Sequence, residues 1–286
     1  MFSGCISMEI KINHQYLLQH KIGNGSFGKI YQGWDTTNNK SVAIKIEPRN
    51  SKKPSYLYRE GYIYSLLRKK AKRKIVQNNT HLPSYIWCGH TKKFDFLVLP
   101  LYGINLRTYF KKNNKNLPDW HDITTQTLSA IKSLHHYNIL HRDIKPENFV
   151  FEGNKLILID YGLSITKNQK IKPTWVGTPK FTSPWIGNDT NYNTRDDLSS
   201  WWIMMFWFWE KGNLPWTSKI GKKKLSRSET KRELHGLQKQ KKEWFIKFLD
   251  ENGSNISSNL PVWFINKGKN IHQDLIAKKN HSLVTL

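Results

Sequence analysis

The sequence has little cysteine, few acidic residues and no long apolar run. Its two cysteines, Cys5 and Cys88, cannot form a disulfide framework, so a reducing compartment, cytoplasmic or nuclear, is expected. The longest apolar stretch, residues 201–209, has about half the length of a membrane span, so no membrane partner is expected. The first residues lack the charged and apolar regions of a secretory signal, and Gly4 lies too late for myristoylation.

Basic residues are in large excess. The chain carries 46 Lys and Arg against 21 Asp and Glu, a net charge of +25, which indicates polyanionic partners. Nucleic acid is not expected as the primary partner, because no RNA- or DNA-binding signature accompanies the charge. The basic residues concentrate at 68–74 (RKKAKRK) and at 219–247, which includes Lys241 and Lys242. Composition leaves two interpretations open: solvated faces, or anion-docking surfaces and a nuclear localisation signal.

Apolar patterning divides the chain into two parts. Short apolar or β-branched runs predict strands at 16–22, 30–33, 42–46 and 96–99, with one helix near 56–70. Later segments predict helices at about 122–137 and 198–209, and a hairpin at 149–159. The segment 198–209 is apolar all round, which indicates a buried helix. We therefore predict an α+β fold with a β-rich N-terminal lobe and a mainly helical C-terminal lobe.

A glycine-rich loop precedes a candidate lysine. Residues 23–28 read Gly-Asn-Gly-Ser-Phe-Gly and lie between two predicted strands, whereas a dinucleotide fold needs a helix after the last glycine. Here the glycines would let a β-hairpin lie close over phosphates. On the next strand Ala43 and Lys45 share one face, where Ala43 leaves space for a flat ligand. Taken alone, Lys45 fits an exposed strand lysine better than a ligand-binding one, but Glu60 on the predicted helix could pair with it.

The most informative stretch follows the second predicted helix. Residues 141–148 read His-Arg-Asp-Ile-Lys-Pro-Glu-Asn, and residues 160–162 read Asp-Tyr-Gly. Phosphoryl transfer requires an oriented nucleophile, neutralised charge and bound Mg²⁺. Asp143, Asn148 and Asp160 supply oxygen ligands of the kind that Mg²⁺ prefers. Each could merely cap a turn, but the ordered set with the glycine loop, lysine and glutamate indicates phosphoryl transfer.

At these motifs the sequence resembles the eukaryotic protein kinase family, and within it the casein kinase 1 group. The segments that carry the resemblance are KIGNGSFGKIYQG (21–33), HRDIKPENF (141–149), GTPKFTS (177–183), RDDL (195–198) and GNLPW (212–216). The vaccinia-related kinases also use Asp-Tyr-Gly, so that branch stays open.

The resemblance implies a bilobal kinase-like fold. It implies a kinase domain over residues 16–265, with an N-lobe at 16–99, a hinge at 100–103 and a C-lobe at 104–265. Residues 1–15 are expected to be an N-terminal extension. Residues 266–286 are expected to be a polar tail that is shortened or disordered.

The resemblance also implies ATP as phosphoryl donor, Mg²⁺ as cofactor and a role for each motif residue. The ATP-binding residues would be Ile22, Gly23, Gly25, Gly28, Ile30, Ala43, Lys45, Glu60 and Tyr102. Asp143 would accept or orient the substrate hydroxyl proton, and Lys145 would stabilise the transferring phosphoryl group. Asn148 and Asp160 would bind Mg²⁺, and Asp197 would tie the catalytic loop to the central helix.

The implied substrates are Ser and Thr hydroxyls of acidic or phosphorylated proteins, and the chain is expected to be a monomer. The basic side chains expected to attract acidic peptides are Lys170, Lys172, Lys180 and Arg195. Thr194 stands where the casein kinase 1 group has an Arg associated with phosphate on a primed substrate, which argues against primed specificity. Thr174 and Thr178 are candidates for phosphorylation by position.

One departure keeps a different class of function open. Residues 183–185 read Ser-Pro-Trp, which matches neither the Ser-Ile-Asn of the casein kinase 1 group nor the usual Ala-Pro-Glu. The helices expected after Trp263 are also hard to find in the sequence. The alternative is therefore a kinase-fold pseudokinase or scaffold with little activity.

Overall fold

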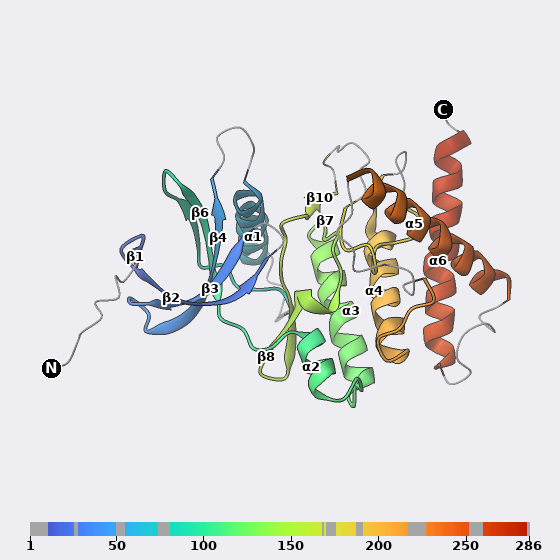
Figure 1. Ribbon diagram of the computed structural model, residues 1–286, viewed down its shortest axis with the longest axis horizontal. Coiled ribbons are helices and arrows are strands. Elements are labelled where there is room, and N and C mark those ends of the chain that lie inside the picture. Colours follow the sequence, from blue (N-terminus) through green and yellow to red (C-terminus); the bar gives the residue numbers. More distant parts are fainter. Residues whose placement is uncertain are drawn as a thin grey trace. The chain divides into compact units, whose positions relative to one another are not determined.

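A computed structural model describes residues 11–25, 28–49, 55–73, 81–167, 169, 176–186, 191–216, 227–251 and 260–284. The chain forms two compact units (Figure 1): unit 1 is Met1–Gly103 with Ile159–Gly162, and unit 2 is Ile104–Leu158 with Leu163–Leu286. Strands dominate unit 1 and helices dominate unit 2, so the predicted α+β fold is present. No helix within the described ranges is long and apolar enough to cross a membrane.

Unit 1 is built on a six-stranded antiparallel sheet in the order β1-β2-β3-β4-β6-β5, against which helix α1 packs. Its elements are β1 (Lys11–Ile12), β2 (Tyr16–Asn24), β3 (Lys29–Asp35), β4 (Lys40–Pro48), α1 (Tyr56–Arg73), β5 (Trp87–His90) and β6 (Phe94–Pro100). Strand β1 pairs with β2, so residues 11–12 belong to the sheet and not to an extension. Residues 1–10 of that expected extension lie outside the described residues.

Alternation along β4 sets the position of the candidate lysine. Val42 and Ile44 are buried in the core on one face of the sheet, together with residues of β2 and β6. Because side chains alternate along a strand, Ala43 and Lys45 lie on the opposite face, as predicted.

Unit 2 is mainly helical. Its helices are α2 (Leu106–Lys112), α3 (Trp120–His136), α4 (Thr194–Trp209), α5 (Arg227–Asp250) and α6 (Val262–Val284), and a 3₁₀ turn spans Pro146–Asn148. Its short strands are β7 (Ile139–Leu140), which pairs with β10 (Ile165–Thr166), and β8 (Phe149–Glu152), which pairs with β9 (Lys155–Leu158). Helix α4 begins at a capping box made by Asn193 and Asp196. Its residues from Asp196 to Phe208 are nearly all buried, which confirms the predicted central helix.

The expectation of a shortened or disordered tail is wrong. Residues 266–284 lie in α6, which follows α5 and packs against α4. Phe264, Ile271 and Leu275 are fully buried, because they recur at helical spacing on one face. Polar residues between them hide this pattern in the sequence.

The two basic regions differ in their surroundings. Arg68 lies exposed on α1 and its guanidinium is 5.9 Å from the ring centroid of Tyr85. In the second region, Lys242 is exposed but Lys241 is fully buried, which corrects the expectation of a uniformly solvated or anion-docking segment. Residues 219–226 of that region lie outside the described residues.

Candidate active site

Lys45 on β4 contacts two carboxylates within unit 1. Its Nζ lies 2.7 Å from Glu60 Oε1 on α1 and 3.2 Å from Asp160 Oδ1. Glu60 is almost fully buried and Lys45 retains only 12% of its side-chain exposure. The expected Lys45–Glu60 pair is therefore present, and Lys45 is not an exposed strand lysine. We call Lys45, Glu60 and Asp160 the lysine cluster.

Burial and charge oppose each other in the lysine cluster. Burial by itself would lower the pKa of Lys45, but the carboxylates of Asp160 and Glu60 outweigh it and raise that pKa above its ordinary value. Burial raises the pKa of Glu60 to about 7, although the charge of Lys45 pulls it down. The pKa of Glu60 stays raised because the single ammonium group of Lys45 is shared by two carboxylates. Additional positive charge nearby would therefore favour the ionised form of both carboxylates.

The backbone at residues 160–161 is constrained toward the lysine cluster. Asp160 has φ of 69°, in the left-handed region that non-glycine residues rarely adopt. The Tyr161 amide donates to Glu60 Oε1 at 3.3 Å, and the Tyr161 ring packs 4.8 Å from that of Tyr64 on α1. These contacts fix the strained turn and hold Asp160 beside Lys45.

The glycine loop borders the same cluster. The Gly25 amide donates to the Gly28 carbonyl at 2.8 Å. A Cβ on Gly28 would lie 2.1 Å from the Ile46 carbonyl of β4, so only glycine permits this close approach. A narrow hollow lined by Gly25, Gly28 and Ile30 extends to the lysine cluster. Residues 26–27 lie outside the described residues.

The remaining predicted nucleotide-binding residues also belong to unit 1. Ile22, which is exposed, and Gly23 lie near the end of β2, and Ala43 lies on the Lys45 face of β4. Tyr102 follows β6, and its hydroxyl accepts a hydrogen bond from the Ser84 amide at 3.1 Å.

In unit 2 the carboxylate of Asp143 is held at both oxygens. Oδ1 accepts hydrogen bonds from the Thr178 amide at 2.8 Å and from the Thr178 hydroxyl at 2.7 Å. Oδ2 lies 2.5 Å from Lys145 Nζ, which also donates to the Thr178 hydroxyl at 3.2 Å. We call these three residues the aspartate cluster. A carboxylate fixed in this way can orient a hydroxyl, and the neighbouring ammonium group can stabilise developing negative charge.

Asn148 is tied to the same loop. Its Nδ2 donates to the Asp143 carbonyl at 2.8 Å, so its amide oxygen remains as the atom suited to a hard cation. Phe149 follows Asn148 directly and pairs with Leu158 in the predicted hairpin. Leu158 lies two residues before Asp160 in the sequence. Within the described residues, no three His, Cys, Asp or Glu side chains gather as a metal site.

Asp197 anchors the loop that carries Asp143. This fully buried residue of α4 accepts hydrogen bonds from the amides of His141 and Arg142 at 2.8 and 2.9 Å. The Tyr192 hydroxyl donates to it at 2.8 Å, and His135 Nε2 lies 2.8 Å away. Burial alone would raise the pKa of Asp197, but the hydrogen bond and charge of His135 lower it. The predicted tie between the loop at residues 141–148 and the central helix is present.

Gly177 allows Thr178 to reach Asp143. Gly177 has φ of 96°, and a Cβ there would lie 2.4 Å from the Arg142 carbonyl. A side chain at this position would therefore push the Thr178 segment away from the loop.

A second set of charged side chains is close in sequence to the aspartate cluster at two points of the chain. Arg107 on α2 lies 2.8 Å from Glu147, which is two residues after Lys145. Lys180, two residues after Thr178, has its Nζ 4.6 Å from the ring centroid of Trp207, and Arg107 lies 5.2 Å from the same centroid. We call Arg107, Glu147, Lys180 and Trp207 the Trp207 cluster. Burial, followed by repulsion from Arg107, lowers the pKa of Lys180 to about 8.

The basic residues expected to attract acidic peptides have different outcomes. Arg195 is paired with Asp274 of α6 at 2.5 Å, so its charge is already compensated. Lys170 and Lys172 lie outside the described residues, as does Thr174. Lys180 makes no ion pair with any residue in the described ranges.

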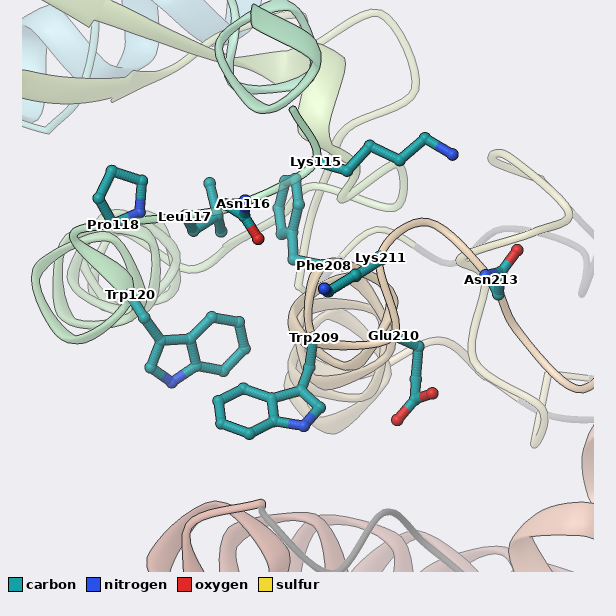
Figure 2. A pocket seen from close by; sticks show the side chains of 10 residues that line it. All are labelled: Lys115, Asn116, Leu117, Pro118, Trp120, Phe208, Trp209, Glu210, Lys211 and Asn213. Atoms are coloured by element: carbon teal, nitrogen blue, oxygen red, sulfur yellow. The ribbon is translucent and has the colours of Figure 1, made fainter. Parts of the chain in front are cut away.

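Another hollow lies elsewhere in unit 2. Figure 2 shows this open pocket of about 550 Å³, lined by Trp120, Phe208, Trp209 and the connection between α2 and α3. It contains none of the predicted site residues, so its size does not make it the reaction site.

Three residues that contact Asp143 or Asp197 were not predicted from the sequence to do so. Thr178 was expected only as a phosphorylation candidate, yet its hydroxyl is engaged by Asp143 and Lys145. His135 and Tyr192 meet Asp197 from distant parts of the chain. The Gly177-Thr178 pair was a usable signal, because it lies in a segment that resembles the family, whereas no local pattern marks the other two.

Comparison with protein-family models places these motifs in one domain. The chain matches the protein kinase domain over residues 16–274, which covers most of its length. The chain therefore belongs to the protein kinase family of phosphotransferases, for which ATP is the phosphoryl donor.

Proposed function

We propose that the chain is a Ser/Thr protein kinase that transfers the γ-phosphoryl group of Mg²⁺-ATP to acidic protein substrates. The observation that carries the proposal is the aspartate cluster. Asp143 is fixed by Thr178 and lies beside Lys145, the arrangement needed to orient an alcohol near a cation.

Each residue of the aspartate cluster has a proposed role. Asp143 accepts or orients the proton of the acceptor hydroxyl, and its buried position keeps water from competing for that proton. Lys145 stabilises negative charge on the transferring phosphoryl group. Its position two residues after Asp143 matches the Ser/Thr-type loop of the family, which supports Ser and Thr over Tyr as acceptors.

The lysine cluster supports nucleotide binding in unit 1. Lys45, held by Glu60, would contact the α- and β-phosphates, and the glycine loop would cover them. Asn148 and Asp160 would hold Mg²⁺ together with phosphate oxygens, and their amide and carboxylate oxygens fit that ion. When bound, Mg²⁺ neutralises phosphate charge.

The Trp207 cluster supports a preference for acidic substrates. Glu147 pairs with Arg107, while Lys180 lies over the Trp207 ring without an ion pair in the described ranges, so the group carries surplus positive charge. An acidic side chain of a substrate would compensate that charge. The casein kinase 1 motifs agree with this preference, while Thr194 argues against a required priming phosphate.

The alternative of an inactive scaffold has less support from the structure than it had from the sequence. That alternative rested on a weak C-terminal match and on the unusual residues 183–185. Helices α5 and α6 are present, and Gln238 of α5 donates to the Ser183 carbonyl at 2.9 Å. The unusual segment is thus anchored to α5.

A transfer assay with labelled ATP tests the proposal. Peptides that differ only in the acceptor residue (Ser, Thr or Tyr) are compared on acidic, neutral, basic and pre-phosphorylated backgrounds. We expect Mg²⁺-dependent labelling of acidic Ser and Thr peptides and none with Lys45→Met. Labelling of Tyr peptides alone, or preference for basic peptides, would contradict the proposed specificity. No transfer to any peptide or protein substrate would favour the scaffold.

A further inference from the structure

Lys241 on α5 is an unusual buried cation. It is fully buried, whereas the next residue, Lys242, is exposed. Among the residues that the structure describes, no ion pair involves Lys241. Burial lowers its pKa well below the ordinary value. Uncompensated burial of an ammonium group opposes folding, so stability alone does not explain a lysine here.

The ammonium group instead binds backbone carbonyls of the segment that follows Thr178. Lys241 Nζ donates to the Pro179 carbonyl at 2.5 Å and to the Thr182 carbonyl at 2.8 Å. It also lies 5.8 Å from the ring centroid of Trp216, a further favourable contact for a cation.

The neighbouring position on α5 binds the same segment further along. Gln238 lies three residues before Lys241, on the same face of the helix. Its Nε2 donates to the carbonyls of Ser183 and Ile186 at 2.9 and 3.2 Å. One face of α5 therefore holds four carbonyls between residues 179 and 186.

A short chain of contacts connects this face to Asp143. The Thr182 amide and hydroxyl both donate to the Thr178 carbonyl, at 3.0 and 2.8 Å. The Thr178 amide and hydroxyl in turn donate to Asp143 Oδ1. A shift of the Thr182 carbonyl would thus be passed to the carboxylate through two threonines.

We propose that Lys241 is a positioning residue for phosphoryl transfer, which fixes the 178–186 segment so that Thr178 holds Asp143. It acts through Thr178 and touches neither substrate nor nucleotide. The inference rests on the proposed function for its catalytic consequence, but its structural part can be measured independently.

The test compares Lys241→Met with Lys242→Met, which removes the same charge from the exposed neighbour. Lys241→Met removes the donor while keeping an unbranched apolar side chain, so the melting temperature should stay equal or rise. The turnover number should fall by ~10- to 100-fold, the size expected from a small misplacement of reacting groups. KM for ATP should remain unchanged, because Lys45 and the glycine loop, which would contact the phosphates, lie in unit 1. Lys242→Met should change none of these quantities.

Hydrogen exchange gives a readout that does not need activity. In Lys241→Met the amides of peptides covering residues 178–186 should exchange faster, and in Lys242→Met they should not. Wild-type turnover in Lys241→Met, or unchanged exchange, would overturn the inference. A lower melting temperature or failure to fold would also overturn it, because the lysine would then be structural. An inactive wild-type protein would refute the proposed function, while exchange would still decide the positioning role.

Discussion

Thr178 binds one oxygen of Asp143 twice, through its amide at 2.8 Å and through its hydroxyl at 2.7 Å. The same hydroxyl accepts a hydrogen bond from Lys145 at 3.2 Å. One threonine thus fixes the relative placement of the proposed base and the proposed phosphoryl-stabilising cation.

Thr178→Val should impair turnover without unfolding the protein. Valine has nearly the same shape and keeps the amide contact to Asp143, but it removes the hydroxyl shared by Asp143 and Lys145. We expect the turnover number to fall by about tenfold, because positioning of reacting groups is lost. Steady-state kinetics with Thr178→Ser as the matched control checks this, since serine keeps the hydroxyl. Equal activity of the valine and serine variants would show that the hydroxyl has no positioning role.

The preference for acidic peptides should depend on pH through Lys180. The pKa of Lys180 is lowered to about 8, so its positive charge is present below that pH and is lost as the pH rises through it. The ratio of kcat/KM for an acidic peptide to that for a neutral peptide should therefore decrease between pH 7 and 9.

Lys180→Met should reduce this ratio by about fivefold at pH 7, the size of a modest ion pair, and should abolish its pH dependence near 8. Lys112→Met, a change at an exposed lysine of α2, is the matched control and should leave the ratio unaltered. A ratio that follows the same pH curve in Lys180→Met would assign the effect to another group.

Asp197 should contribute to stability in a pH-dependent way. Its pKa in the folded protein is below the ordinary value of 3.8, so the unfolded state binds the proton more readily. The resulting stabilisation is present above about pH 4 and is lost as the pH falls through the folded-state pKa. Asp197→Asn should therefore be less stable at pH 7, by about 1–3 kcal/mol, because buried donors lose a charged acceptor.

Urea unfolding at a series of pH values between 2 and 7 measures the effect. The stability difference between wild type and Asp197→Asn should shrink on acidification. A difference that stays constant down to the lowest pH would mean that ionisation of Asp197 does not stabilise the fold.

Much of unit 1 was predictable because local patterns determine it. Alternation along β4 placed Lys45 on the face opposite Val42 and Ile44, and the 15-residue spacing to a helix suggested Glu60 as its partner. Strand β1 was missed, since two residues are too short for a periodic signal and only pairing with β2 orders them.

Unit 2 shows where local pattern fails. Lys241 looks like part of a solvated basic run, and its burial follows from packing of α5 against residues 179–186, which no local signal records. Helix α6 was taken for a tail because its buried residues Phe264, Ile271 and Leu275 are spread among polar ones. The role of Thr178 depends on contact with a residue 35 positions away, so it required the folded structure.

The most direct test of the account compares catalysis with nucleotide binding in Asp143→Asn. Asparagine keeps the size of the side chain but removes the negative charge that would accept or orient the hydroxyl proton. The account predicts a fall in turnover of roughly 10²- to 10⁴-fold, with Mg²⁺-ATP affinity, measured by calorimetry, close to that of wild type. Turnover equal to that of wild type in Asp143→Asn would contradict the account.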